Sequence, residues 1–165
     1  MRIRPAQAHE SCLVADLLTA AAESLVQRGQ ALWASAEVSE AAVRVHVETG
    51  MYHVAFDDEG PIGVFRFQLE DPYFWPEVET GSSAFVHKMA VHPHRQRRGV
   101  AQLLLHHACE LARQRGRRFL RLDCVSGRPK LRAVYQNFGF VHHSQKQIGR
   151  QVFDRFEFQV GEPDA

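Results

Sequence analysis

The chain has 165 residues, of which 45% are hydrophobic and 24% are charged, and its formal net charge at pH 7 is +1. This length and composition predict one folded domain over residues 1–165 and exclude a disordered or fibrous chain. The near-neutral charge argues against a surface built to bind nucleic acid, and the longest apolar runs are too short to cross a membrane.

Apolar residues recur along the chain with two periods. Alternation with polar residues predicts strands, and apolar residues three or four positions apart predict helices. The expected elements in chain order are a strand at residues 2–4, helices at 9–27 and 39–50, strands at 52–56, 64–69 and 84–91, a helix at 99–115, a strand at 119–124, a helix ending at Gly139, and strands starting near 140 and 151. This order indicates a mixed α/β fold with one central sheet flanked by helices.

The three cysteines, Cys12, Cys109 and Cys124, are widely spaced and include no CxxC pair. This pattern predicts neither a disulfide framework nor a metal site, and it favours a reduced environment. The first residues lack the apolar stretch of a signal peptide. We therefore expect a cytoplasmic protein without a bound metal.

The stretch Met89–Ala101 joins a strand to a helix through a short basic loop. Amides at a helix N-terminus point outward, and the helix dipole adds roughly half a positive charge there. Gly99 lets an anion approach the backbone, and Arg95, Arg97 and Arg98 reinforce the positive field. The loop has neither the GxxxxGK[ST] of a P-loop nor a GxGxxG pattern, so neither a nucleoside triphosphate nor a nicotinamide cofactor is indicated. On charge alone, a solvated turn is an equally good interpretation.

The segment Gln96–Ala101 resembles the Q/R-x-x-G-x-G/A motif of the GNAT acetyltransferases. Met89–Pro93, Leu120–Cys124 and Leu131–Phe140 are similar to family segments and occur in the family order, so that the resemblance covers about Tyr52–Phe140. It implies the GNAT acyl-CoA N-acyltransferase fold, with one mostly antiparallel central sheet whose middle strands are splayed. It also implies acetyl-CoA (coenzyme A) as the cofactor.

The resemblance places the pyrophosphate of coenzyme A on backbone amides of the loop. It places the pantetheine arm along the strand that ends near Val91. In the family, this strand separates from the strand that ends near Cys124 and so admits the arm. The implied cofactor-binding residues are Met89, Ala90, Val91, Gln96, Arg97, Arg98, Gly99, Val100, Ala101 and Gln102. Relatives commonly carry an asparagine where this chain has Gly127-Arg128-Pro129. Arg128 then either reaches a cofactor phosphate or projects into solvent.

Acetyl transfer to an amine needs a base for the amine and a proton for the leaving thiolate. Tyr135 falls where the family has the tyrosine that protonates the sulfur, although a helical tyrosine is often a packing residue. Strand alternation puts His87 on one face with Phe85 and Met89, and His87 resembles the histidine implicated in proton removal in the arylalkylamine branch. A structural histidine with a water chain as the base is the alternative. A ping-pong route through Cys124 is disfavoured because its strand is expected to be buried.

Trp33, Tyr73 and Trp75 offer aromatic walls for an amine acceptor, while packing is the commoner role of tryptophan. The leading hypothesis is an N-acetyltransferase that acts on a small-molecule primary amine by direct transfer in a ternary complex, with no nucleic-acid or membrane partner. Transfer to a protein N-terminus or lysine, and a non-catalytic acetyl-CoA sensor, are the alternatives. A homodimer is also possible, because many members of the family dimerise.

Overall fold

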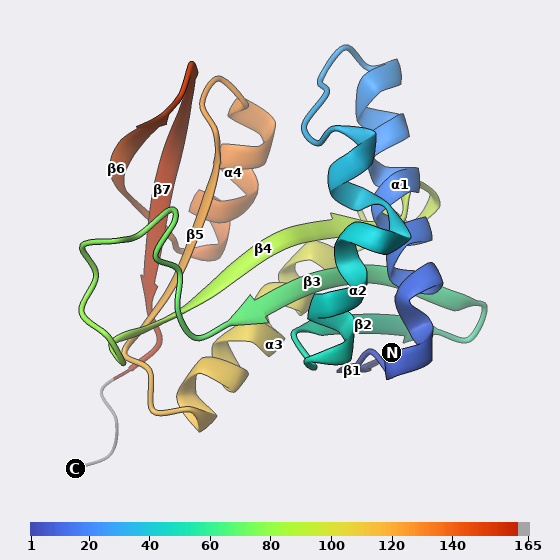
Figure 1. The fold of residues 1–165 in the computed structure, drawn as a ribbon, viewed down its shortest axis with the longest axis horizontal. Helices are drawn as coiled ribbons and strands as arrows, with labels where there is room; N and C mark the ends of the chain where they lie inside the picture. The colour runs from blue at the N-terminus through green and yellow to red at the C-terminus, as the bar shows by residue number, and fades with distance from the viewer. Residues whose placement is uncertain (162–165) are drawn as a thin grey trace. The chain divides into compact units, whose positions relative to one another are not determined.

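Seven strands form one mixed sheet in the computed structural model, which describes residues 1–161 (Figure 1). The strand order is β1-β2-β3-β4-β5-β7-β6. β4 and β5 pair in parallel, whereas the pairs β1–β2, β2–β3, β5–β7 and β6–β7 are antiparallel. The mixed α/β class and the mostly antiparallel sheet predicted from the sequence are therefore confirmed.

Every predicted strand and helix is present. The strands are β1 (Arg2–Pro5), β2 (Tyr52–Asp57), β3 (Gly60–Gln68), β4 (Ser83–Val91), β5 (Phe119–Val125), β6 (Val141–Ile148) and β7 (Gln151–Gln159). The α-helices are α1 (Ser11–Gln27), α2 (Glu40–Glu48), α3 (Val100–Gln114) and α4 (Pro129–Phe138), and the 3₁₀ turns are η1 (Ala8–Glu10), η2 (Ser35–Val38) and η3 (Pro93–Arg95). Within the described part of the chain, no helix combines the length and the apolar character that spanning a bilayer requires.

Contacts group the chain into two compact units, each made of two chain segments. Unit 1 comprises Met1–Arg66 and Lys88–Leu104, and unit 2 comprises Phe67–His87 and the chain from Leu105 onward. The strands β3 and β4 and the helix α3 thus contribute residues to both units. A single domain over residues 1–165 stays a prediction.

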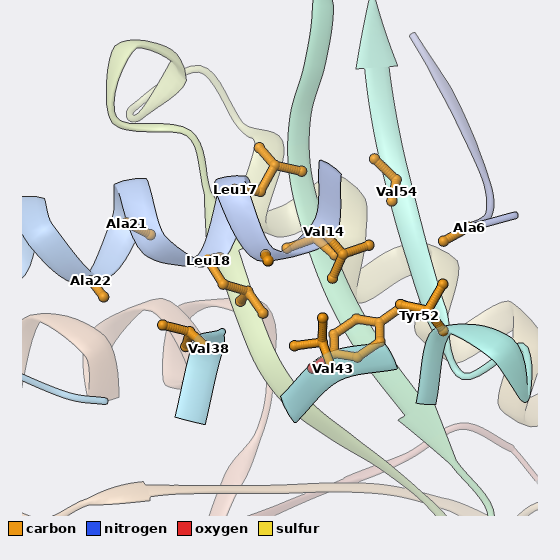
Figure 2. Close-up of a cluster of buried hydrophobic side chains, with 14 residues drawn as sticks. Ala6, Val14, Leu17, Leu18, Ala21, Ala22, Val38, Val43, Tyr52 and Val54 are labelled. Carbon is orange, nitrogen blue, oxygen red and sulfur yellow. The ribbon is translucent and has the colours of Figure 1, made fainter. Parts of the chain in front are cut away.

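The core of unit 1 is an apolar cluster to which α1, α2 and the strands contribute (Figure 2). Val14 and Leu18 of α1 lie one turn apart and are fully buried, as are Val43 of α2 and Tyr52 and Val54 of β2. This helical spacing is the period from which α1 and α2 were predicted. The side chain of Ser39 accepts a hydrogen bond from the backbone amide of Ala42 and so forms the N-cap of α2.

β3 also contacts the first turns of α3, through Gly63. A Cβ atom at Gly63 would lie 3.1 Å from side-chain atoms of both Val100 and Leu104, and 3.2 Å from the carbonyl oxygen of Ala90. The next residue, Val64, belongs to the buried cluster around α1 and α2. Because neighbouring strand residues face opposite sides, the missing side chain at Gly63 is what lets the start of α3 approach β3.

Aromatic rings form much of the packing in unit 2. Tyr135 of α4 contacts Phe156 of β7 at 5.7 Å between ring centroids, and Phe138 contacts Phe158 at 5.3 Å. Gly139 ends α4 with φ +125°, and a Cβ there would lie 3.0 Å from the ring of Phe158. The helix α4 is thus held against β7 by its aromatic face and stops where only glycine fits.

Replacing Gly63 by valine is expected to destabilise the fold by about 1–3 kcal/mol, since overpacking forces Val100, Leu104 or the backbone to move. Gly63→Ala should give a smaller loss in the same urea unfolding experiment. The exposed Gln151→Val, also in a strand, is the control and should leave the free energy of unfolding nearly unchanged. A Gly63→Val protein as stable as the parent would contradict the close approach of β3 and α3.

Candidate functional site

The junction between β4 and α3 in unit 1 has the geometry of an anion-binding turn. Gly99 has φ +76°, a left-handed conformation that glycine adopts without strain, and the space beside its α-carbon is open. Its carbonyl accepts from the amide of Leu103, which is the first bond of α3. The first-turn amides of Val100, Ala101 and Gln102 have no intrahelical acceptor, so they are available to an anion.

The basic residues of this loop play different roles. Arg97 and Arg98 are exposed, and Arg97 has φ +63°. Arg95 instead donates from Nε to Asp57 Oδ2 at 2.9 Å and pairs with Glu59, both of the turn between β2 and β3. Two carboxylates therefore neutralise Arg95, which corrects the expectation that it adds to the field at the turn.

The same loop is fixed by contacts within unit 1. The amide of His92 donates to the carbonyl of Ile62 at 2.8 Å, and Arg28 at the end of α1 donates to Gln96 Oε1 at 3.2 Å. Together with the Arg95 ion pairs, these bonds hold the loop in place before any ligand arrives. Such preorganisation reduces the entropy that an anion must overcome to bind.

The remaining cofactor candidates of unit 1 lie on β4 and at the start of α3. Ala90 and Val100 are buried at 6% and 2% exposure, whereas Met89, Val91 and Ala101 are half-buried. Because these side chains are buried or half-buried, a ligand lying along this segment would contact mainly its backbone. This fits recognition by strand-like pairing. The loop thus suits a diphosphate, and the strand before it suits an extended amide chain.

β4 departs from regular alternation at Lys88, which has φ +49°. The prediction that His87 and Met89 share one face by alternation therefore does not hold through this residue. Within unit 1, Lys88 Nζ lies 5.3 Å from the ring centroid of Trp33 and 3.3 Å from Glu37 Oε1. Trp33, a predicted acceptor residue, is partly buried against the unit 1 core.

In unit 2, His87 lies between two carboxylates. Its Nε2 is 2.7 Å from Asp71 Oδ2 and its Nδ1 is 3.9 Å from Asp123 Oδ2. The three side chains are 8%, 3% and 6% exposed, respectively. A buried imidazole beside charged acceptors is a common arrangement for a general base.

Asp71 is held in its charged form. Burial by itself raises the pKa of Asp71, but the hydrogen bond with His87 and backbone amides of the following loop bring its pKa below the usual value. One of these amides, that of Phe74, donates to Asp71 Oδ1 at 3.0 Å. The ring of Phe74 also lies 5.5 Å from that of His87, so it covers the imidazole.

The role of Asp71 and Asp123 was not predicted from the sequence. No motif in the sequence singled out Asp71, and Asp123 lay only within the family-like segment Leu120–Cys124. What brings Asp123 to His87 is the parallel pairing of β4 with β5, whose register runs from Ser83↔Phe119 to Val86↔Leu122. It sets His87 and Asp123, the next residues of the two strands, close together.

Tyr135 is buried on α4, and its ring packs on Phe156 and Phe140. Burial raises the pKa of Tyr135, and electrostatic interactions with Cys124 and Asp123 raise it further. The phenol therefore keeps its proton and is a hydrogen-bond donor that can stabilise a leaving thiolate, although the raised pKa makes it a weaker acid. The packing and the catalytic interpretation of this residue are compatible, because the ring packs while the hydroxyl remains a donor.

Cys124 is a poor nucleophile in this environment. Burial, together with the charges of Asp154 and Asp123, raises the pKa of its thiol to about 12. The thiolate that a ping-pong route needs is therefore scarce at neutral pH. The thiol of Cys109 is also buried, with a pKa of about 11, whereas Cys12 is exposed.

The two aromatic candidates of the loop differ in exposure. Tyr73 is 63% exposed, whereas Trp75 is 2% exposed, and the guanidinium groups of Arg155 and Arg121 lie 4.5 Å and 4.9 Å from the centroid of its ring. This burial favours the packing role for Trp75. Arg128 occupies the N-cap position of α4 and is half-buried.

A cavity of 680 Å³ lies in unit 1, away from the predicted site residues. It is lined by α1, by the turn between β2 and β3 and by the loop that follows β4, with Leu17, Ile62 and Arg95 among its walls. Its walls include none of the residues predicted to bind cofactor or acceptor. The predicted site is therefore defined by its hydrogen-bonding groups rather than by this cavity.

Known proteins share both the sequence pattern and the fold of this chain. The model of the acetyltransferase (GNAT) family matches residues 15–140. A GNAT-family acetyltransferase from Listeria monocytogenes 4b F2365 has a similar structure, with a TM-score of 0.80, 18% identity, and coverage of 96% of this chain and 94% of that chain. No curated protein matches the sequence significantly.

Two further solved structures share the fold. The yncA protein of Salmonella typhimurium, solved with its cofactor acetyl-CoA, has a TM-score of 0.72 and 18% identity, with coverage of 99% of this chain and 98% of that chain. The ribosomal-protein-S18-alanine N-acetyltransferase of Escherichia coli has a TM-score of 0.71 and 16% identity, with coverage of 96% and 93%. At such identities the likeness shows a shared fold and not a shared acceptor.

Thiol labelling tests the burial of Cys124. In the native protein at pH 8, a maleimide should modify Cys12 and leave Cys109 and Cys124 unmodified, because only Cys12 is exposed. In urea all three thiols should react, as counted by mass spectrometry. Cys12→Ser is the control and should abolish native labelling. Fast labelling of Cys124 would show that its thiol is accessible and would reopen the ping-pong route.

Proposed function

Because its sequence matches the GNAT family model over residues 15–140, the chain belongs to the GNAT acetyltransferase family, and we propose that it transfers an acetyl group from acetyl-CoA to a primary amine of a small molecule. The observation that carries the proposal is the turn at Gly99, whose carbonyl accepts the first hydrogen bond of α3 and whose α-carbon has open space beside it. We propose that Gln96–Gln102 hold the pyrophosphate and that the main chain of Met89–Val91 holds the pantetheine arm.

Two residues of unit 2 are proposed to move protons. His87, oriented by Asp71 at 2.7 Å, accepts a proton from the ammonium form of the acceptor. When bound, acetyl-CoA supplies the thioester carbonyl that the free amine attacks directly in a ternary complex. Tyr135, kept protonated by its raised pKa, donates a hydrogen bond to the sulfur and stabilises it as it leaves. The raised pKa of the Cys124 thiol supports direct transfer over an acetyl-cysteine intermediate.

A small amine is favoured over a protein acceptor because the base is almost fully enclosed. His87 is 8% exposed and is covered by the ring of Phe74. A small-molecule amine reaches such an enclosed group with less rearrangement of the site than an amine on a folded protein surface does. Tyr73, 63% exposed beside Phe74, is proposed to contact the acceptor. We further propose a cytoplasmic location, in keeping with three free cysteines.

An acceptor screen tests this function. Release of the coenzyme A thiol is followed by a thiol reagent, with the Cys12→Ser variant as the enzyme so that its own exposed thiol does not react. The panel contains small aliphatic and aromatic amines, and peptides with either a free N-terminus or a lysine. Turnover of small amines is expected. Turnover of peptides alone would favour a protein acetyltransferase, and acetyl-CoA binding without any turnover would favour a sensor.

Gly99→Leu should weaken acetyl-CoA binding by about tenfold or more, because the side chain fills the approach to the amides and strains the turn. Isothermal calorimetry measures the affinity. Gly50→Leu is the matched control, since Gly50 has the same φ of +76° at the end of α2 and also has open space beside it. That variant should lose similar stability yet bind acetyl-CoA normally. Equal effects of the two variants on affinity would remove the turn from the binding site.

Tyr135→Phe should reduce kcat by about a hundredfold, which is typical for loss of a positioned acid, and leave acetyl-CoA affinity within about twofold. Steady-state kinetics and calorimetry measure the two quantities. Tyr52→Phe provides the control, because Tyr52 is equally buried but belongs to the unit 1 core. Unchanged turnover in Tyr135→Phe would leave this residue with its packing role alone.

A further inference from the structure

The loop between β3 and β4 carries two residues that contact His87, Asp71 and Phe74. Asp71 Oδ2 lies 2.7 Å from His87 Nε2, and the ring of Phe74 lies 5.5 Å from the imidazole. The amide of Phe74 donates to Asp71 Oδ1 at 3.0 Å. The carboxylate of Asp71 therefore joins the backbone of this loop to the imidazole.

A buried arginine on β7 holds the other side of the same loop residue. Arg155 is 7% exposed, and its Nη1 donates to the carbonyl of Phe74 at 2.9 Å. Both backbone polar groups of Phe74 are thus bonded to side chains, the amide to Asp71 and the carbonyl to Arg155. A residue held at both of these groups has little freedom to move.

Further contacts orient the guanidinium of Arg155. Its Nε donates to Ser144 Oγ of β6 at 2.8 Å, and its Nη1 lies 2.7 Å from Glu77 Oε1. The group also lies 4.5 Å from the ring centroid of Trp75. Burying an arginine charge is unfavourable unless its donors find partners in good geometry. Most of the partners of this guanidinium belong to the loop, since Phe74, Trp75 and Glu77 all lie there.

The strand β7 also contacts the side chain of Phe74. Phe153 and Arg155 are two residues apart on β7, so they point to the same face of the strand. The ring of Phe74 lies 5.1 Å from that of Phe153. One strand therefore fixes both the backbone and the ring of the residue that covers His87.

We infer that Arg155 is a positioning residue for the proposed proton transfer, and that it acts through Phe74 and Asp71. By holding the carbonyl of Phe74, Arg155 keeps the loop against His87 and keeps the Asp71 carboxylate in contact with Nε2. This inference rests on the proposed function, in which His87 accepts the proton of the amine. Arg155 itself touches neither the amine nor the cofactor in this role.

Arg121 provides a matched control, because it resembles Arg155 in burial, in its carboxylate partner and in its contact with Trp75. It is 8% exposed, lies 4.9 Å from the ring centroid of Trp75 and pairs with Glu157 at 2.9 Å. Its Nε, however, donates to Ser83 Oγ at the start of β4, at 2.9 Å. Removal of either arginine deletes a buried charge, but removal of Arg155 also releases a backbone carbonyl of the loop.

Amide hydrogen exchange, followed by NMR, tests the Arg155–Phe74 bond without any substrate. Arg155→Met should speed exchange of the Phe74 amide by about tenfold or more relative to the Phe140 amide, because the loop is released locally. The Phe140 amide donates to the carbonyl of Tyr135 in the same unit, so it reports loss of global stability. Arg121→Met should change the exchange of both amides alike.

Kinetics test whether this bond serves catalysis. With the amine that gives the fastest turnover in the acceptor screen, Arg155→Met should lower kcat by about tenfold or more, because the base is misplaced. Acetyl-CoA affinity, measured by calorimetry, should stay within about twofold, since the turn at Gly99 is unchanged. Arg155→Lys keeps a cation that can donate to the same carbonyl, so it should recover part of kcat. Arg121→Met should keep kcat within about twofold of the parent.

A double-mutant cycle separates positioning from a purely structural role. If Arg155 acts through Asp71, then Arg155→Met should add little to the loss of kcat in an Asp71→Asn background. Independent contributions would instead multiply the two losses.

Should Arg155→Met fail to fold, Ser144→Ala takes its place, because it removes the partner of Nε and loosens the same guanidinium. It should speed exchange at Phe74 selectively, to a smaller extent. Equal changes at Phe74 and Phe140, an unchanged kcat, or losses that multiply fully in the cycle would overturn the inference. A parent protein that turns over no amine would refute the proposed function instead, while the exchange data would still decide whether Arg155 holds the loop.

Discussion

The turn at Gly99 is the constraint on which the proposed acetyl-CoA site depends. A helix begins there because the backbone adopts φ +76° and the carbonyl of Gly99 accepts the first helical bond. The same conformation leaves the first-turn amides pointing away from the helix. Other features of unit 1 serve this turn, since the absent side chain of Gly63 admits α3, and Arg95 is fixed by carboxylates of the neighbouring hairpin.

The acceptor side depends on a different principle, the control of protonation by burial. Asp71, His87 and Asp123 are each less than one-tenth exposed, so their charges and hydrogen bonds act with little screening by water. One carboxylate lies 2.7 Å from Nε2 of the ring and the other lies 3.9 Å from Nδ1. The same burial that keeps Tyr135 protonated also suppresses the Cys124 thiolate, which leaves direct transfer as the route that the protonation states support.

The similarity to solved acetyltransferases accounts for the fold but not for the acceptor. The E. coli neighbour acts on a ribosomal protein, according to its name, and shares 16% identity with this chain. What distinguishes acceptors within one fold is the set of side chains around the amine. In this chain the set proposed for that role is an enclosed histidine with acidic and aromatic neighbours.

The sequence by itself determined the order of the elements and the fold class, and it predicted the anion-binding turn, because these depend on local periodicity and on a short motif around Gly99. It also singled out His87 and Tyr135, through their positions in family-like segments. Only the tertiary structure decided that Arg95 is neutralised by Asp57 and Glu59 and that the buried Trp75 packs against two arginines. It alone joined Asp71 and Asp123 to His87, because these residues come from a loop and two strands that are distant along the chain, and no local pattern records which side chains the pairing of strands brings within hydrogen-bonding range.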